Sequence, residues 1–389
     1  MSDTFLLSAC RTPIGKFRGT LASLSVSDLG AHAIRAAVEQ ARVAPAAVDE
    51  VIFGNMLSAG VGQAPARQAA LKAGLPPAVA AVTINKVCGS GLKAVMLGSQ
   101  AIQCGDANII VAGGMESMTN SALVRPRNAA DDDSQQLDTM VYDGLTCAMT
   151  GLGMGKIAEK VADESRVTRQ DQDKFALQSH QRACAAADAG LFANEILPIT
   201  VTSEGESSIV DRDQGPRSDT SQESLAGLKT AFRKDGSVTA GNASMVSDGA
   251  AAVVIASKQA AAKAGSQPLA RIVCSVTSGE KPDDLFIAPV AAIRKVLTKA
   301  GRTLDEVDLF ELNEAFASQS LACLRQLDLT TDRVNVNGGA IALGHPLGAS
   351  GARVLVTLLH ALKARNLKTG VASLCLGGGN AVAMLVERL

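Results

Sequence analysis

The chain has 389 residues, and its 37 basic and 38 acidic side chains leave a net charge of −1. This balance argues against binding nucleic acid through a basic face and against attachment to an anionic membrane by charge. Hydrophobic residues make up 47% of the sequence but aromatic residues only 3%, so small and aliphatic side chains must fill the core.

Strand-like and helical patterns alternate along the chain, which is typical of an α/β fold. In chain order we expect strands at Phe5–Ala9, Val51–Phe53, a stretch ending at Ile84, Ala107–Ala112, Leu269–Val276, Val307–Leu312 and Val371–Leu376. The expected helices are Leu29–Ala41, Gly91–Cys104, Thr168–Ala187, Val290–Ala300 and Gly351–Ala364. Thr168 and Asp171 form a start that resembles a capping box.

The sequence also contains an internal repeat. Ala33-Ile34-Arg35 recurs as Ala292-Ile293-Arg294, and Ser90-Gly91 recurs as Ser350-Gly351, where each copy is expected to open a helix. The glycine runs in Val111–Gly114 and Leu376–Gly379 are then expected to close each copy after a strand. The segment from Thr119 to Thr239 has no counterpart, and it is long for a loop. It is either a surface insertion or a lid over a substrate.

The first motif that carries chemistry surrounds Cys88 in the sequence NKVCGSGLK. Because a strand ends at Ile84 and a helix is expected from Gly91, Cys88 lies at or just before a helix N-terminus. Free N–H groups and the helix dipole stabilise a thiolate at such a position. Cys88 is therefore either a nucleophile or a buried structural cysteine in a glycine-rich turn.

The second motif, GHPLGASG, precedes the equivalent helix of the second copy and contains His345. The repeat places this turn opposite the Cys88 turn, and the chain has only four histidines. His345 is thus the best candidate for a base that acts on Cys88. The alternative is a histidine that caps the helix or stabilises the turn.

Two further motifs lie in the second copy. In LCLGGGN, Cys375 closes a buried strand, and the glycine N–H groups that follow can line an oxyanion site. Cys375 is a candidate redox partner or proton donor, whereas the alternative is a core strand followed by a bulge. A weaker signal is Asn313 in ELNEAF, whose amide can donate a hydrogen bond or position water.

The remaining cysteines show no spacing that indicates a metal or redox site. No pair has the CxxC spacing and the histidines are scattered, so we expect no zinc site. The N-terminus lacks a signal-type segment and no apolar run reaches the length of a membrane span. We therefore expect a soluble, cytoplasmic protein whose other six cysteines are small core residues.

Together these motifs resemble those of the thiolase family, the acetyl-CoA acyltransferases. NKVCGSGLKA, AGGMESM, TAGNAS followed by SDGAAA, NEAFA, GHPLGASG and CLGGG occur in the family's order over nearly the whole chain. The resemblance implies a layered αβαβα fold of two duplicated βαβαβαββ-type halves, residues 1–118 with 244–267 and residues 268–389. It also implies that residues 119–243 form an inserted loop subdomain covering coenzyme A, and that the chain forms homodimers or homotetramers.

The same resemblance implies a role for each motif. Cys88 would take the acyl group as a thioester, and His345 would deprotonate it and share an oxyanion site with a water held by Asn313. Cys375 would be the general acid/base at the substrate α-carbon, and the N–H groups of Cys88 and Gly377 would form a second oxyanion hole. Contacts with coenzyme A are implied for Arg217, Ser224, Ser244, Met154, Leu145 and Phe316. Coenzyme A thioesters would be substrates, so no cofactor is expected.

The implied activity is the reversible Claisen condensation of two acetyl-CoA to acetoacetyl-CoA plus CoA, or the thiolytic cleavage of 3-oxoacyl-CoA, in fatty-acid metabolism. The stretch Tyr142–Thr146 is similar to the short-chain type. Gly153 and Phe286 depart from the usual short-chain pattern, and Phe286 adds bulk near the acyl end.

Three alternatives remain open. The first is a degradative thiolase of broader chain length. The second is a ketosynthase of the same fold, which would need a histidine in place of the Asn313-Glu314 site. The third is an acyl-CoA-binding scaffold without activity, which would be expected to lose Cys88, His345 or Cys375.

Overall fold

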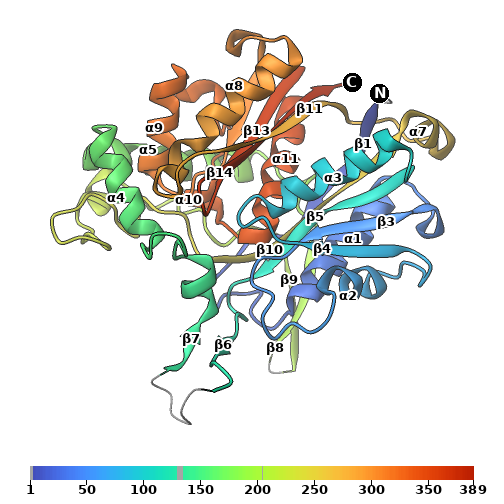
Figure 1. The fold of residues 1–389 in the computed structure, drawn as a ribbon, viewed down its shortest axis with the longest axis horizontal. Coiled ribbons are helices and arrows are strands. Elements are labelled where there is room, and N and C mark those ends of the chain that lie inside the picture. Colours follow the sequence, from blue (N-terminus) through green and yellow to red (C-terminus); the bar gives the residue numbers. More distant parts are fainter. Residues whose placement is uncertain (1–2, 129–134, 204) are drawn as a thin grey trace.

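A mixed β-sheet folds around two central helices, and further helices cover its outer faces (Figure 1). The computed structural model describes residues 3–128, 135–203 and 205–389. Its strands follow the order β12-β13-β14-β11-β1-β10-β5-β3-β4. The first half supplies β1 (Thr4–Arg11), β3 (Glu50–Gly54), β4 (Ala80–Ile84), β5 (Ile109–Ser117) and β10 (Ser247–Ser257), with β2 (Gly15–Lys16) at the end of β10. The second half supplies β11 (Ala270–Gly279), β12 (Leu309–Leu312), β13 (Thr369–Leu376) and β14 (Asn380–Arg388).

The two halves share one pairing pattern, as the internal repeat predicts. In the first half β3 is parallel to β5, and β5, β10 and β1 follow as antiparallel neighbours. In the second half β12 is parallel to β13, and β13, β14 and β11 follow in the same antiparallel order. β1 and β11 pair antiparallel at Thr4–Leu6 and so join the halves into one continuous sheet.

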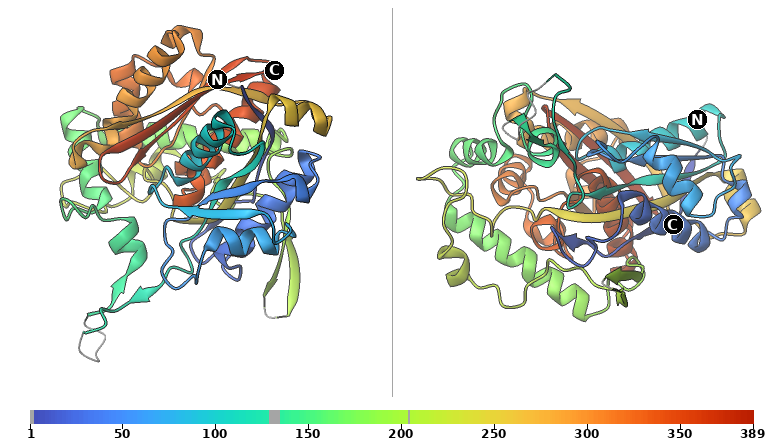
Figure 2. Two further views of the ribbon diagram at one scale, coloured as in Figure 1. Left: turned by 45° about the vertical axis from the view of Figure 1, so that its right-hand side comes forward. Right: turned by 90° about the horizontal axis from the view of Figure 1, so that it is seen from below.

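The helices form three layers separated by the two halves of the sheet (Figure 2). The helices α1 (Val26–Gln40) and α2 (Pro65–Lys72) cover the outside of the first half. The helices α8 (Ala288–Ala300) and α9 (Ala317–Leu327) cover the second half. Between them lie α3 (Ser90–Cys104) and α11 (Leu347–Ala364). The layered αβαβα arrangement is therefore confirmed.

Strands that are buried on both faces explain the composition. Along β10, Ala250, Ala252, Val254 and Ala256 pack toward the outer helices, whereas Ala251, Val253 and Ile255 pack toward the central ones. Small aliphatic residues fit on both sides of such a strand because neighbouring layers are closely packed.

The segment between β5 and β10 supplies further elements that pack against both halves of the molecule. Its elements are β6 (Leu123–Val124), β7 (Leu137–Asp138), α4 (Met154–Glu164), α5 (Arg169–Asp188), β8 (Ile199–Ser203), β9 (Glu206–Val210) and α6 (Gln222–Ala226). The strands β6 and β7 extend away from the body of the molecule (Figures 1 and 2). Thr168 and Asp171 form the expected capping box of α5.

Shorter elements complete the fold. The helix α7 (Lys258–Ala264) follows β10, and the helix α10 (Ala340–Leu343) precedes the His345 turn. Single turns of 3-10 or π-helix lie at Pro45–Ala47, Met140–Gly144, Pro282–Ile287, Leu304–Glu306 and Thr331–Arg333. No helix in the described part of the chain is long and apolar enough to cross a membrane.

Two details of the expected repeat are wrong. Gly113 and Gly114 do not follow the strand but lie inside β5, which continues to Ser117. A Cβ on Gly114 would lie 2.0 Å from the Gly348 carbonyl oxygen, so glycine is needed here for the start of α11 to pack against β5. The helix α11 itself begins at Leu347, so Ser350-Gly351 lie in its first turn rather than opening it.

The repeat-related glycines Gly91 and Gly351 set the crossing of the two central helices. A Cβ on Gly351 would lie 2.3 Å from the backbone nitrogen of Leu92, and a Cβ on Gly91 would lie 2.6 Å from that of Ala352. Each glycine therefore lets the other helix approach its backbone. This contact brings the turns that precede α3 and α11 to one place, where the site lies.

Candidate active site

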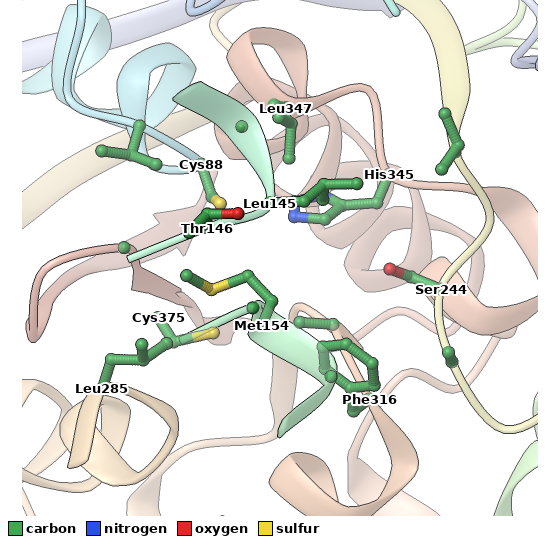
Figure 3. Close-up of a pocket in the computed structure, with 18 of the residues that line it drawn as sticks. Cys88, Leu145, Thr146, Met154, Ser244, Leu285, Phe316, His345, Leu347 and Cys375 are labelled. Atoms are coloured by element: carbon green, nitrogen blue, oxygen red, sulfur yellow. The ribbon is translucent and has the colours of Figure 1, made fainter. Parts of the chain in front are cut away.

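A cavity of about 390 Å³ lies where the two central turns meet the end of β13. Eight of the eleven predicted site residues line it: Cys88, His345, Cys375, Gly377, Ser244, Met154, Leu145 and Phe316. The Cys88 and Cys375 sulfurs and the His345 ring point into this space (Figure 3). The inserted segment contributes Leu145 and Met154 and thereby closes one side.

The Cys88 turn is held in an uncommon backbone conformation. Val87 has φ of +51°, a left-handed value that is costly for a β-branched residue. Ser90 stabilises the turn, because its hydroxyl accepts from the N–H of Lys86 at 2.8 Å and donates to the Val87 carbonyl at 2.6 Å. A Cβ on Gly89 would lie 2.7 Å from Leu376, so this glycine lets the end of β13 approach Cys88.

The Cys88 thiol is neutral in the free protein. Burial raises its pKa to about 11, although the N–H groups of Gly377 and of Cys88 itself point at the sulfur and lower the pKa. The shift is opposite to the one expected from the helix dipole, because desolvation outweighs the N–H donors. Cys88 therefore needs a base before it can act as a nucleophile.

His345 is oriented as such a base by Ser350. The Ser350 hydroxyl lies 2.6 Å from Nδ1 and donates its single proton to the Pro346 carbonyl at 2.8 Å. Nδ1 must therefore carry the proton and donate to Ser350 Oγ, which leaves Nε2 as an acceptor. Burial and the positive charge of Arg353 lower the His345 pKa to about 3, so the ring is neutral.

Cys375 and the glycine turn after it complete the opposite wall. Cys375 is the next-to-last residue of β13, and burial together with nearby Cys88 raises its pKa well above the ordinary value. The protonated thiol is thus the resting form and can act as a proton donor. The N–H groups of Gly377 and Cys88 both point at the Cys88 sulfur and lower its pKa. The oxyanion-hole role implied for them stays a prediction.

Asn313 is not among the residues that line the cavity. It follows β12 and is fully buried, and the guanidinium of Arg353 donates to its Oδ1 at 3.5 Å. Its neighbour Glu314 has a structural role, since it accepts from Ser179, Asn335 and the N–H of Ile341. The role predicted for Asn313 stays a prediction.

Arg217 and Ser224 line a second cavity of about 320 Å³, together with His180. Ala243 and Met245, the chain neighbours of Ser244, line both cavities, so the two spaces are adjacent. This arrangement is compatible with the predicted contacts, whose roles stay predictions.

Two side chains near the site were missed by the sequence-based reasoning. Ser350 carried no signal of its own beyond its place five residues after His345. Cys147 was grouped with the core thiols, but hydrogen bonds from Thr150, Met149 and Gly378 lower its pKa despite burial. All eight cysteines are free. Within the described residues there is no group of three or more His, Cys, Asp or Glu that could hold a metal ion.

Comparison with known proteins gives a consistent result. The family model described as "Thiolase, N-terminal domain" matches residues 4–259, and that described as "Thiolase, C-terminal domain" matches residues 266–388. The chain is 50% identical over 393 residues to an acetyl-CoA acetyltransferase of Escherichia coli (strain K12), with all of both chains covered. It is 52% identical over 392 residues to an acetyl-CoA acetyltransferase of Pseudomonas aeruginosa, again over the full length of both. The crystal structure of the Bacillus anthracis acetyl-CoA acetyltransferase superposes with a TM-score of 0.98 at 43% identity, covering 100% of this chain and 99% of that one.

Proposed function

The chain belongs to the thiolase family, and we propose that it interconverts two acetyl-CoA with acetoacetyl-CoA and CoA through an acyl-cysteine on Cys88. One observation carries this proposal: two thiols and one neutral imidazole, those of Cys88, Cys375 and His345, meet in a single cavity. Such a set can transfer an acyl group between sulfurs and can move a proton at a neighbouring carbon.

In the cleavage direction, Cys88 gives its proton to Nε2 of His345 and its sulfur bonds to C3 of the 3-oxoacyl-CoA. The bond between C2 and C3 then breaks, and its electron pair forms the enolate of acetyl-CoA. The neutral Cys375 thiol donates its proton to C2, which fits the raised pKa of that thiol. The N–H groups of Cys88 and Gly377 stabilise the oxyanion on the carbon bound to Cys88.

A second acyl transfer completes the cycle. The thiol of CoA loses its proton to the Cys375 thiolate, and its sulfur attacks the acyl group on Cys88. The Cys88 thiolate leaves and recovers the proton held by His345, so both thiols return to their resting forms. Condensation follows the same steps in reverse. The steps are reversible because each acyl transfer between sulfurs replaces one thioester with another.

Coenzyme A would extend from Cys88 through the space beside Ser244 toward Arg217 and Ser224. The adjoining cavities at Ala243 and Met245 support this path. We also propose that the inserted segment, residues 119–243, covers coenzyme A along its length. Arg217 supplies a cation that suits a phosphate group.

We propose that bulky side chains limit the acyl end of the cavity and thereby favour short substrates. Phe286 and Phe316 pack edge to face with ring centres 5.3 Å apart, and Leu285 lies beside them in the lining. We expect cleavage of the four-carbon 3-oxoacyl-CoA to exceed that of eight-carbon and longer substrates by at least tenfold in kcat/KM. Phe286→Ala should reduce this difference in kcat/KM between short and long substrates. Equal rates for all lengths in the wild type would instead favour a degradative thiolase of broader chain length.

The proposed chemistry is tested by separating acylation from proton transfer. Cys88→Ser should lower acetoacetyl-CoA thiolysis by about a thousandfold or more, because the hydroxyl is a far weaker nucleophile at neutral pH. Cys375→Ala should still become acetylated at Cys88 by acetyl-CoA, as seen by mass spectrometry of the intact protein. It should lose the exchange of acetyl-CoA methyl hydrogens with D₂O.

The matched control is Cys10→Ala, which removes a buried thiol on β1 that donates to the Ala33 carbonyl. This variant should keep wild-type turnover. Unchanged turnover in Cys88→Ser would overturn the nucleophile assignment, and persistent exchange in Cys375→Ala would place the proton donor elsewhere.

The finer expectations on assembly and location follow from family membership. We propose that the chain forms a homodimer or homotetramer and acts in the cytoplasm. Sedimentation velocity distinguishes a monomer, a dimer and a tetramer directly.

A further inference from the structure

Behind the catalytic cavity lies a cluster of fully buried charged and polar side chains. Arg353, on the second turn of α11 after His345, is 1% exposed, and Glu311 on β12 is 2% exposed. Their nearest charged atoms, Nη1 and Oε2, are 3.6 Å apart. Asn313 completes the cluster through the 3.5 Å hydrogen bond from Arg353 Nη2 to its Oδ1.

The contact with Arg353 decides which way the Asn313 amide points. A guanidinium has only donors, so the amide atom that faces it must be the oxygen. The Nδ2 group then points away from Arg353. In the reverse orientation two sets of N–H groups would oppose each other in a buried environment, which is strongly unfavourable.

The cluster has many polar atoms without a protein partner. Among the described residues, no hydrogen-bond partner exists for Asn313 Nδ2, Arg353 Nε and Nη1, or either carboxylate oxygen of Glu311. Buried polar groups are almost always satisfied, and small polar cavities are filled by water. Donors and acceptors are both present here, so water molecules can satisfy both kinds.

We infer that Arg353 is a positioning residue for Asn313, because its guanidinium fixes the amide with the unpartnered Nδ2 group toward the reacting thioester. This inference rests on the proposed function, because it concerns the step in which the acetyl-CoA enolate forms. Burial lowers the pKa of Arg353, and the carboxyl of Glu311 is the strongest of the neighbouring groups that oppose this shift.

The inference predicts a selective defect. Arg353→Met removes the donors that fix the amide but leaves Cys88, Cys375 and Gly377 in place. The exchange of acetyl-CoA methyl hydrogens with D₂O should fall roughly 10- to 100-fold, as when a donor to a developing oxyanion is lost. Acetylation of Cys88, measured by rapid quench and mass spectrometry, should not fall, because loss of the Arg353 charge raises the pKa of the His345 base.

A double-mutant cycle separates positioning from general destabilisation. Asn313→Ala should show the same defect as Arg353→Met, and the double variant should lose no more than about threefold further. Arg353→Lys keeps the charge and part of the donor set, so it should recover part of the exchange rate. It also serves as the working variant if Arg353→Met does not fold.

The control is Val356→Ala, which removes methyl groups from the same buried helix without touching the cluster. The fold losses in exchange rate caused by Val356→Ala and by Asn313→Ala should multiply in the double variant. If the losses of Arg353→Met and Asn313→Ala multiply in the same way, or if acetylation and exchange fall together, Arg353 does not act through Asn313. Failure of the proposed function would look different, because the wild-type protein would then neither acetylate Cys88 nor exchange hydrogens.

Discussion

Ser350 shows how a single hydroxyl decides the chemistry of its neighbour. Its proton is committed to the Pro346 carbonyl, so it can only accept from His345 Nδ1. The other ring nitrogen is thereby kept free of a proton. The low pKa of His345 keeps the ring neutral, and the contact with Ser350 leaves Nε2 as the acceptor nitrogen.

Replacing Ser350 by alanine should impair turnover without abolishing binding. The imidazole would lose its fixed tautomer and orientation, and we expect kcat for acetoacetyl-CoA thiolysis to fall about 10- to 100-fold with little change in KM. Steady-state kinetics measures both. Ser318→Ala is the matched control, because this buried hydroxyl on α9 also donates to a main-chain carbonyl, that of Ala158, away from the cavity. Equal effects of the two substitutions would contradict the tautomer argument.

Individual reactive residues were predictable where a glycine-rich turn surrounds a thiol or an imidazole. Cys88, His345 and Cys375 were identified in this way, and the structure places them in one cavity. The Cys88 pKa was not predictable, because the helix N-terminus is visible in the sequence but the burial that outweighs it is not. Ser350 acts through a tertiary arrangement that its own motif does not reveal.

At the scale of helices and strands, the contact between α3 and α11 determines where the two central turns lie. Gly91 and Gly351 occupy equivalent positions in the two halves and face each other's helix backbone. Neither neighbour can move easily, because the opposing atoms belong to the main chain of a packed helix. The positions of Cys88 and His345 therefore depend on the absence of a side chain at these two glycines.

Gly351→Ala should separate the central helices and weaken both stability and catalysis. The added Cβ would meet the Leu92 backbone nitrogen at 2.3 Å, and we expect a loss of about 1–3 kcal/mol in the free energy of unfolding. A shift of about 1 Å at the reacting groups should lower kcat by roughly a hundredfold. Urea titration and thiolysis kinetics test these values.

Gly98→Ala on α3 is the appropriate comparison. Its added Cβ would meet mainly the terminal methyl group of Ile255, which can change rotamer. We expect near-normal activity and a small change in stability, since alanine also favours the helix. Similar losses at both glycines would argue that the crossing has no special role.

The sequence predicted elements well where one period dominated, and less well elsewhere. The helices α1, α5 and α8 were located because they have a polar face or a recognisable cap. The strand β10 was missed because its first half consists mainly of glycine and alanine, which have low strand propensity. The Gly113-Gly114 pair was misread as a strand end, since the close approach of Gly348 that requires it is a tertiary contact.

For the whole molecule, the near-balance of charge means that particular buried groups, rather than overall repulsion, govern the response to pH. His180 is one of them. It is 7% exposed, its Nδ1 accepts from the N–H of Arg217, and burial together with the Arg217 charge lowers its pKa to about 4.

His180 should make the folded state sensitive to acid. Because its pKa is lower in the folded than in the unfolded chain, the stability it contributes is complete above about pH 6.5 and is lost as the pH falls toward 4. His180→Asn keeps an acceptor for Arg217 but cannot titrate. The difference in free energy of unfolding between the two proteins should shift by roughly 2–3 kcal/mol in favour of the variant between pH 7 and pH 4.

Urea midpoints measured at several pH values check this prediction. Above pH 7 the difference between wild type and His180→Asn should be constant. A difference that stays constant down to pH 4 would show that His180 is accessible to protons in the folded state.

A protein assembled from two identical half-chains could not hold this site. Any reactive group on one central turn would appear again on the other, and a cavity of about 390 Å³ would have to accommodate both copies. Joining the halves in one chain lets each turn change alone. One turn carries the thiol and the other the imidazole, so the different chemistry of the two turns depends on the covalent link between the halves.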